Sequence, residues 1–209
     1  MKMIGIVVAL CVVVVVVWQL SRQPGEGTAR SLRGGRDFRI EAATAEMDDA
    51  SLAWAVVEPI WTLAQGSDDD EKLPAEWAGV TEGQLAVYAV VWVEREVVNG
   101  GFWQYLYNSN ADLPRKALDG FRKLGATEYA GLLEQAISLF PGGKLPKTRT
   151  ERMRLMPEDP YVDVAEEHKA MVEGLDELDS RFFELYGEGD QFYLFIGDYI
   201  RANPEAFFK

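Results

Sequence analysis

Two adjacent glycines inside a long apolar and aromatic stretch constrain the fold of this chain more than any other feature. The apolar segment 85–93 continues through charged residues to Asn99, Gly100 and Gly101, and the aromatic segment 102–107 follows at once. Asn and Gly tolerate positive φ, so this triplet can close one helix and turn the chain sharply into the next. We therefore expect two packed helices that meet at a corner.

The second of these helices carries polar side chains among its aromatic ones. Gln104 and Asn108 are four residues apart. On a helix they share one face and can hydrogen-bond to each other or to exposed backbone groups near the break. Two interpretations remain open. The polar groups belong either to a capped helix corner that satisfies them internally or to a polar recognition pocket.

Three strings of this sequence carry a resemblance to a known family. They are NGGFWQYLYNS at 99–109, ALDGFRKLG at 117–125 and GLLEQAISLFP at 131–141, and the closing FYLFIGDYIRANPEAF at 192–207 agrees with them. Over residues 47–208 the chain resembles the DNA mimic protein 19 family, a bacterial domain family. The motif residues in this chain are Asn99, Gly100, Gly101, Phe102, Gln104, Tyr105, Asn108 and Ser109.

The resemblance implies both a fold and a kind of function. It implies an all-α domain, and for one member of the family an acidic dimer that occupies the DNA-binding face of a transcription regulator. A protein partner with a basic surface is therefore the expected ligand of this chain, and a homodimer is left open.

The charge of the chain is strongly negative and unevenly distributed. The net charge is −13, yet residues 1–40 contain six basic and two acidic side chains, so residues 41–209 carry −17. Phosphate contacts need Lys and Arg, which argues against direct nucleic-acid binding by this acidic part. Its charge suits a basic partner surface, or it serves solubility alone.

The N-terminal sequence predicts a membrane anchor. Residues 3–18 are an unbroken non-polar run closed by Trp18, and no small-residue cleavage site follows them. Five arginines lie within about twenty residues after the run, which favours a cytoplasmic position for the domain by the positive-inside rule. A cleaved signal with an exported or periplasmic domain is the alternative. The only cysteine, Cys11, lies in this run.

The expected architecture is a compact multi-helix all-α domain at 46–209, behind a single N-terminal transmembrane anchor at 1–20 and a flexible basic tether at 21–45. Pro59 is expected to kink the first helix of the domain, and Thr81 and Gln84 match a capping box for the helix that leads to Asn99. Residues 144–160 predict an irregular, basic surface loop with a helical turn near 149–155.

A long amphipathic helix at 163–186 is the clearest periodic segment. One apolar stripe recurs at steps of three and four through Val164, His168, Met171, Leu175, Leu178, Phe182 and Leu185. The acidic residues that lie away from this stripe form the expected partner-binding face, namely Glu166, Glu173, Asp176, Glu177 and Glu184. A solvated helix face with no partner is the alternative.

The sequence offers little for catalysis. His168 is the only histidine and falls on the apolar stripe, and no cysteine follows residue 11. Zinc sites of the His/Cys type and Cys-His nucleophiles are therefore not expected. We expect no metal, no cofactor and no enzymatic activity, with a carboxylate-based hydrolase or an envelope-associated structural protein as the alternatives.

Overall fold

The computed structural model describes residues 36–64, 75–110, 112–187 and 189–209. Contacts within the chain gather these described residues in one compact unit. The predicted anchor at 1–20 lies outside the described residues. Within the described ranges, no helix has both the length and the apolar character needed to cross a membrane.

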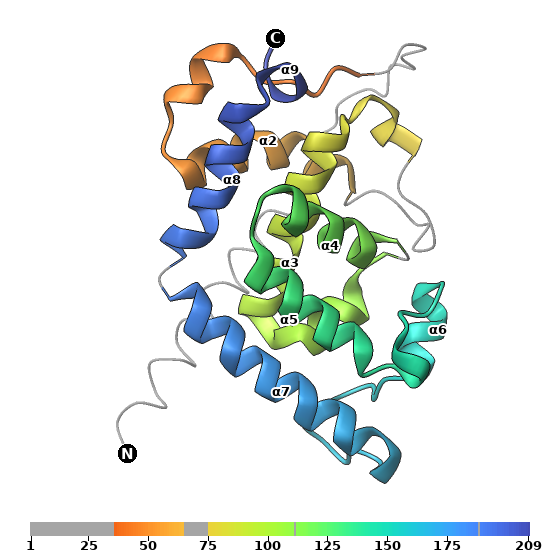
Figure 1. The fold of residues 1–209 in the computed structure, drawn as a ribbon. Coiled ribbons are helices and arrows are strands. Elements are labelled where there is room, and N and C mark those ends of the chain that lie inside the picture. The colour runs from red at the N-terminus through yellow and green to blue at the C-terminus, as the bar shows by residue number, and fades with distance from the viewer. Residues whose placement is uncertain (1–35, 65–74, 111, 188) are drawn as a thin grey trace. The chain divides into compact units, whose positions relative to one another are not determined.

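The described part is helical throughout, as expected (Figure 1). Outside the helices, Ile40 and Phe208 form an isolated parallel β-bridge. The elements follow one another as η1 (Ala42–Glu46), α2 (Asp49–Ala64), η2 (Ala75–Gly79), α3 (Glu82–Asn108), α4 (Leu113–Lys123), α5 (Thr127–Ser138), η3 (Pro141–Gly143), α6 (Arg149–Arg154), α7 (Glu166–Tyr186), α8 (Asp190–Ala202) and α9 (Pro204–Phe207).

Helix α3 is the centre of the domain. It packs against α2, α4 and α7, and most of its residues from Gly83 to Val97 are buried. The predicted capping box starts it, because Thr81 Oγ1 accepts from the backbone N–H of Gln84 and the Gln84 side chain accepts from Thr81 N. The valine-rich segment is thus a buried helix that tertiary packing surrounds on several sides.

Helix α2 continues through Pro59, so the proline does not interrupt the helix. Proline removes one backbone hydrogen bond from a helix, which usually bends it. Here Val56, Val57 and Ile60 on both sides of Pro59 are fully buried, and α2 packs on both α3 and α8. Burial on two neighbouring helices holds α2 in register across the proline.

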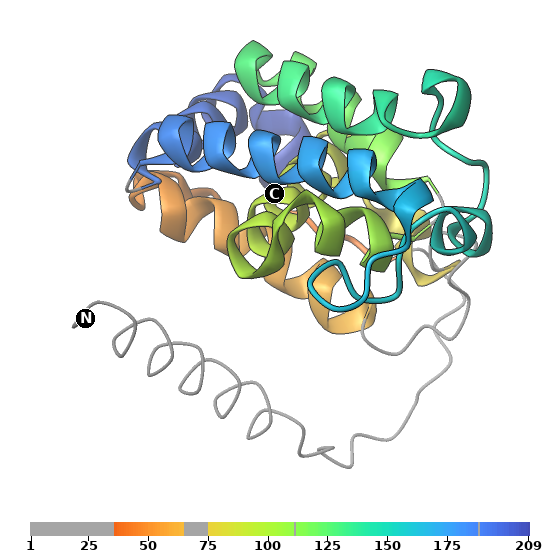
Figure 2. The same ribbon diagram turned by 90° about the horizontal axis from the view of Figure 1, so that it is seen from below.

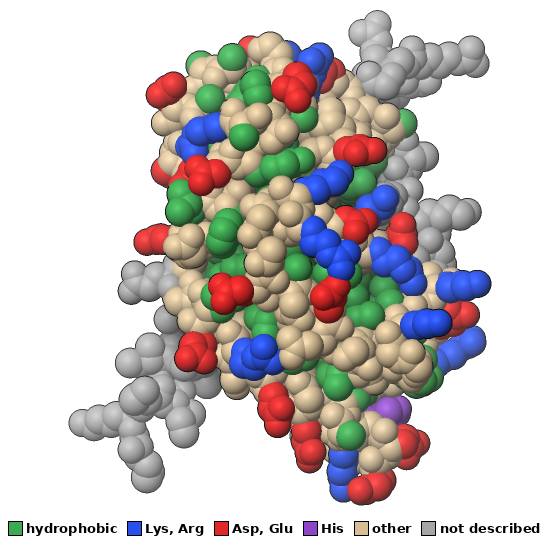
Figure 3. Space-filling model, viewed as in Figure 1, with side chains coloured by type: hydrophobic (Ala, Val, Ile, Leu, Met, Phe, Trp, Pro, Cys, Tyr) green, Lys and Arg blue, Asp and Glu red, His purple; other side chains and the backbone are tan. Residues whose placement is uncertain are grey.

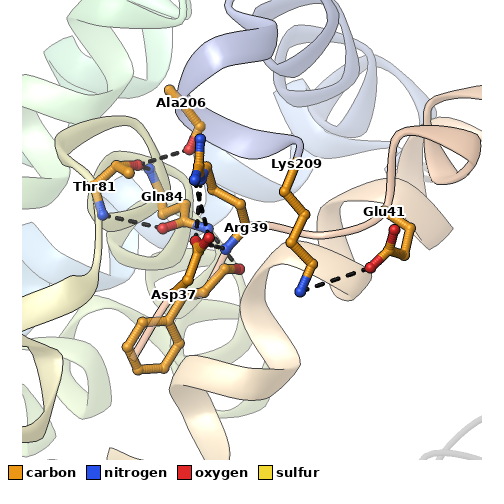
Figure 4. A network of polar contacts seen from close by, with 8 residues as sticks. Asp37, Arg39, Glu41, Thr81, Gln84, Ala206 and Lys209 are labelled. Atoms are coloured by element: carbon orange, nitrogen blue, oxygen red, sulfur yellow. Dashed lines mark hydrogen bonds and ion pairs between the residues drawn. The ribbon is translucent and has the colours of Figure 1, made fainter. Parts of the chain in front are cut away.

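The two ends of the described chain are joined (Figure 4). The backbone N–H of Ile40 donates to Phe207 O at 2.8 Å, and Lys209 N donates back to Ile40 O at 3.0 Å. Figure 4 shows a further contact between the same segments, the ion pair of Lys209 with Glu41. The fully buried Gln84 fixes the same region, because its Nε2 donates to Phe38 O at 2.7 Å. Residues 36–46 therefore fold onto the domain and are not part of a flexible tether. The rest of the tether predicted for 21–45, residues 21–35, lies outside the described residues.

Candidate functional site

The corner predicted at the tandem glycine lies inside α3. Gly100 has φ −164° and ψ 28°, which is extended backbone, whereas Gly101 has φ 76° and ψ −179°. The backbone N–H of Phe102, freed by this break, donates to Asp179 Oδ1 of α7 at 2.7 Å. A Cβ on Gly101 would lie 2.1 Å from Asp179 Oδ2. The glycine thus provides the left-handed conformation and also lets α7 approach the break closely.

The carboxyl group of Asp179 has an unusual acidity. Desolvation raises its pKa from 3.8 to about 6, the Phe102 N–H bond works against this rise, and the neighbouring charge of Asp176 adds to it. The corner therefore uses a half-buried carboxylate as the acceptor for a backbone donor that the helix break leaves without a helical partner.

We expect Asp179→Asn to remove a pH dependence of stability. A folded-state pKa above the unfolded value means that the folded protein binds the Asp179 proton more tightly. The stabilisation that this proton adds to the folded state is therefore full below pH 4 and is lost as the pH rises through about 6. Asparagine keeps the acceptor for Phe102 N–H and carries no charge. Thermal melts between pH 4 and 7.5 should show that the melting temperature of the wild type decreases with rising pH more steeply than that of the variant. Parallel curves for the two proteins would disprove the assignment.

The polar motif residues converge on a side chain that the sequence analysis did not select. Glu96 Oε2 accepts from Gln104 Nε2 at 3.1 Å and from Asn108 Nδ2 at 2.7 Å. Burial raises the pKa of the Glu96 carboxyl, and the two amide donors oppose that rise. Gln104 and Asn108 share one face as predicted, but their common partner is Glu96 across the corner rather than each other or the backbone. These contacts support the interpretation of a capped corner whose polar groups are satisfied internally.

The aromatic motif residues divide into a buried set and a half-buried pair. Phe102 and Tyr105 are buried, and Ser109 ends the helix by donating its hydroxyl to Tyr105 O at 2.6 Å. Trp103 stacks on Tyr107 with ring centroids 4.8 Å apart, and its Nε1 donates to Pro157 O at 3.1 Å. The motif therefore holds the segment after α6 against the end of α3.

Two arginines of α6 bind the last carbonyl groups of α3. Arg149 Nε donates to Tyr107 O at 3.0 Å, and Arg152 donates to Leu106 O at 2.9 Å and to Ser109 O. Arg152 is fully buried. The sequence predicted a basic surface patch at 144–160, and the helical turn in it is confirmed as α6, but Arg152 belongs to the interior. The last carbonyl groups of a helix have no hydrogen-bond donor within the helix, and these guanidinium groups provide the missing donors.

A third carboxylate of the interior lies about two turns before the corner. Glu94 is 6% exposed, its Oε1 accepts from the Tyr186 hydroxyl at 2.7 Å, and its Oε2 has no hydrogen-bond partner. One signal for such a group is present in the sequence, since Glu94 directly follows the apolar run 85–93. This carboxylate links α3 to the end of α7.

The predicted acidic face lies on α7 and is exposed along its whole length. Glu166, Glu173, Glu177 and Glu184 point within about 40° of one another at 3.6 residues per turn, and we call these four residues the acidic stripe. Asp176 is exposed but lies about 80° to one side, toward Asp179. The buried residues Met171, Leu175, Leu178 and Phe182 occupy the opposite side, which confirms the predicted periodicity.

The acidic stripe is mostly free of ion pairs. Glu166 contacts Lys169 at 2.5 Å, whereas Glu173, Glu177 and Glu184 form no ion pair with any described residue. Acidic side chains line the α7 edge of the molecule in Figure 3. Figure 2 shows α7 crossing the domain, where it packs on α3 and α5. The motif and the stripe are separate, and Asp179 joins them because it lies on α7 and bonds to the corner.

Fold and site together define an acidic, all-helical domain with a capped glycine corner and an exposed acidic helix. A model of the DMP19-like protein family matches residues 78–203, from η2 to the end of α8, and the chain belongs to this family. The two segments whose backbones are hydrogen-bonded to each other, at Ile40 and at Phe207 and Lys209, lie outside the match. No curated protein and no solved structure matches the chain.

Proposed function

We propose that the domain is a protein-interaction module whose acidic stripe docks on a basic surface of a partner, such as the DNA-binding face of a transcription regulator. The observation that carries this proposal is the alignment of four exposed carboxylates on one face of α7, three of them without an ion pair in the described residues. Unpaired surface charges of one sign accelerate association with a surface of the opposite sign. Family membership supports the same kind of function.

The spacing of the stripe bears on how far the domain imitates DNA. The first and last of its four carboxylates are about 27 Å apart along the helix at 1.5 Å per residue. Duplex DNA carries a charge about every 1.7 Å along its axis. The stripe therefore offers a few discrete contact points, and a DNA-like surface requires further acids beside it, such as Asp176 and Glu167.

Replacement of the four stripe residues by Gln should abolish partner capture. We expect at least about a tenfold loss of capture, because each lost contact with a desolvated cation costs on the order of 1 kcal/mol or more. The melting temperature should stay nearly unchanged, since surface substitutions of this kind have small effects. In-cell crosslinking followed by mass spectrometry measures the captured protein.

A matched control variant removes four negative charges elsewhere, with Gln at Glu46, Glu58, Glu128 and Glu205. All four are exposed, and none forms an ion pair in the described part of the chain. This control should capture the partner as the wild type does. Equal capture by the stripe variant and the wild type would refute docking through α7. If the stripe variant and the control lose capture to the same extent, net charge rather than the acidic stripe determines capture.

The proposal includes an N-terminal anchor with the domain on the cytoplasmic side, which rests on the apolar run 3–18 and the arginines after it. A reporter active in one compartment only, fused after Lys209, measures the side. A cytoplasmic signal agrees with a DNA-binding partner. A signal from the outer side would rule that partner out and direct the search to envelope proteins.

The enzymatic alternative draws on the raised pKa values of Glu96 and Asp179, since perturbed carboxylates gather at catalytic sites. Both groups already accept hydrogen bonds from the corner itself, through Gln104 and Asn108 and through Phe102 N–H. We therefore assign their burial to the corner and propose a binding rather than a catalytic function.

A further inference from the structure

An open hollow of about 430 Å³ lies between the end of α3 and α6. Its size falls within the range of about 300–1,000 Å³ that is usual for ligand pockets. None of its residues belongs to the acidic stripe. The lining consists of Tyr107, Thr150, Met153, Arg154, Met156 and Glu158.

The walls of the hollow are fixed by internal hydrogen bonds. Arg149 and Arg152 attach α6 to the end of α3, and Trp103 attaches the following segment through Pro157 O. A second capping box, formed by Thr148 and Glu151, starts α6. Because these elements are already in place, a ligand would not have to order them, and preorganisation of this kind increases affinity.

The floor of the hollow is apolar and adaptable. Met156 is buried, Met153 is half-buried, and the half-buried ring of Tyr107 is stacked on Trp103. Methionine side chains are unbranched and polarisable, so they adjust to bulky apolar groups of different shapes. The floor therefore suits one large aliphatic or aromatic side chain.

The surroundings of the hollow are basic in a protein that is acidic as a whole. Residues 144–158 contain five basic and two acidic side chains, against a net charge of −13 for the chain. Lys144, Lys147 and Arg154 are exposed and form no ion pair with the residues that the structure describes. Glu151 is engaged by the backbone N–H groups of Lys147 and Thr148. In Figure 3, basic side chains gather over the α6 side of the molecule.

The apolar lining and the unpaired basic side chains of this segment, Arg154 in the lining among them, together favour one kind of occupant. We propose that the hollow binds a short acidic segment of a partner protein, with one bulky apolar side chain against Met153 and Met156 and a neighbouring carboxylate on Arg154. Arginine pairs with a carboxylate through two parallel hydrogen bonds, which fixes the orientation of the segment. Lys144 and Lys147, which precede α6 in the chain, attract further acidic residues of the segment. This site has the opposite charge preference to the acidic stripe.

Fluorescence anisotropy of labelled peptides on the purified full-length protein tests this site. The probe is a short synthetic peptide with a central Leu-Phe pair flanked by Asp and Glu residues. Two control peptides replace either the central pair by Ser-Ser or the flanking acids by Asn and Gln. We expect the probe to bind with a Kd of about 1–100 μM and both control peptides to bind at least about tenfold more weakly.

Three protein variants complete the test. Arg154→Gln and Met153→Gln should each weaken probe binding about tenfold, and Lys123→Gln, which removes a positive charge on α4, should bind as the wild type does. All three should melt within about 2 °C of the wild type, as exposed or half-exposed substitutions do. Equal binding of the Ser-Ser peptide, unchanged binding by the Arg154 variant, or no binding at about 1 mM would overturn the proposal. Arg154-dependent adhesion to phosphatidylserine vesicles without peptide binding would also overturn it, in favour of a lipid headgroup.

Discussion

Gly101→Val should leave little folded protein. Valine resists the left-handed φ of 76° at this position, and its Cβ would lie 2.1 Å from Asp179 Oδ2. Relief of that overlap requires the Asp179 carboxylate to turn away or α7 to shift, and either movement breaks the 2.7 Å bond between Phe102 N and Asp179 and loosens the packing of α7 on α3. Strain and lost packing together should cost more than about 4 kcal/mol, a large part of the stability of an ordinary domain.

Gly131→Val is the matched control for this substitution. Gly131 lies in α5, its φ is not positive, and an added Cβ would meet no atom within 4 Å. Valine has a higher helix propensity than glycine, so the control should melt at or slightly above the wild-type temperature. Denaturant unfolding followed by circular dichroism compares the three proteins. Similar midpoints for Gly101→Val and the wild type would show that the corner does not need a glycine.

Arg152→Met should have the second largest effect. The arginine is fully buried and donates to Leu106 O and Ser109 O at the end of α3. Methionine fills similar space but has no donor, so the buried carbonyl groups would lose their partners at a cost of about 2–4 kcal/mol in total. Arg152→Lys should be nearly as damaging, because an ammonium group cannot reproduce the planar fork of a guanidinium.

Arg154→Met, two residues further along, separates burial from charge. Arg154 is exposed, and its loss should change the free energy of unfolding by about 0.5 kcal/mol or less. The measurement is the difference between the urea midpoints of the two variants. If both variants unfold at the same midpoint, the buried network of Arg152 does not stabilise the end of α3.

Those features of the fold that depend on neighbouring residues could be predicted from the sequence. Thr81 and Gln84 form the capping box because the motif is local, and the break at Gly101 follows from backbone freedom at one residue. The apolar stripe of α7 also repeats within one helix, so its buried side and its acidic side could be assigned without tertiary information.

Features made by residues distant in sequence could not be predicted in this way. Glu96 reaches Asn108 only because the chain bends between them, and Asp179 meets Phe102 across two helices. Arg152 lies in a basic segment whose composition indicates a surface, yet its burial is set by the carbonyls of α3. The hydrogen bond from Gln84 Nε2 to Phe38 O likewise joins residues far apart in the sequence, and no local pattern indicates it.

The corner and the acidic stripe are linked structurally through Asp179. Asp179 fixes α7 against the break in α3, which keeps the buried side of α7 on the core and its carboxylates toward solvent. Under the proposed function, the family motif would hold α7 in place, and contact with a partner would fall to residues outside the motif. This separation explains why the most distinctive string of the sequence consists of largely buried or internally bonded residues.

Site-specific photocrosslinking from α7 tests the central claim most directly. A photoreactive amino acid placed at Ala170 or Ser180, both exposed beside the acidic stripe, would report what touches this face in the cell. The same group at the exposed Ala202, at the end of α8, is the control. The account predicts one dominant adduct with a basic protein from both α7 positions and none from Ala202. Adducts of equal yield from all three positions, or an adduct from Ala202 alone, would contradict docking through the acidic stripe.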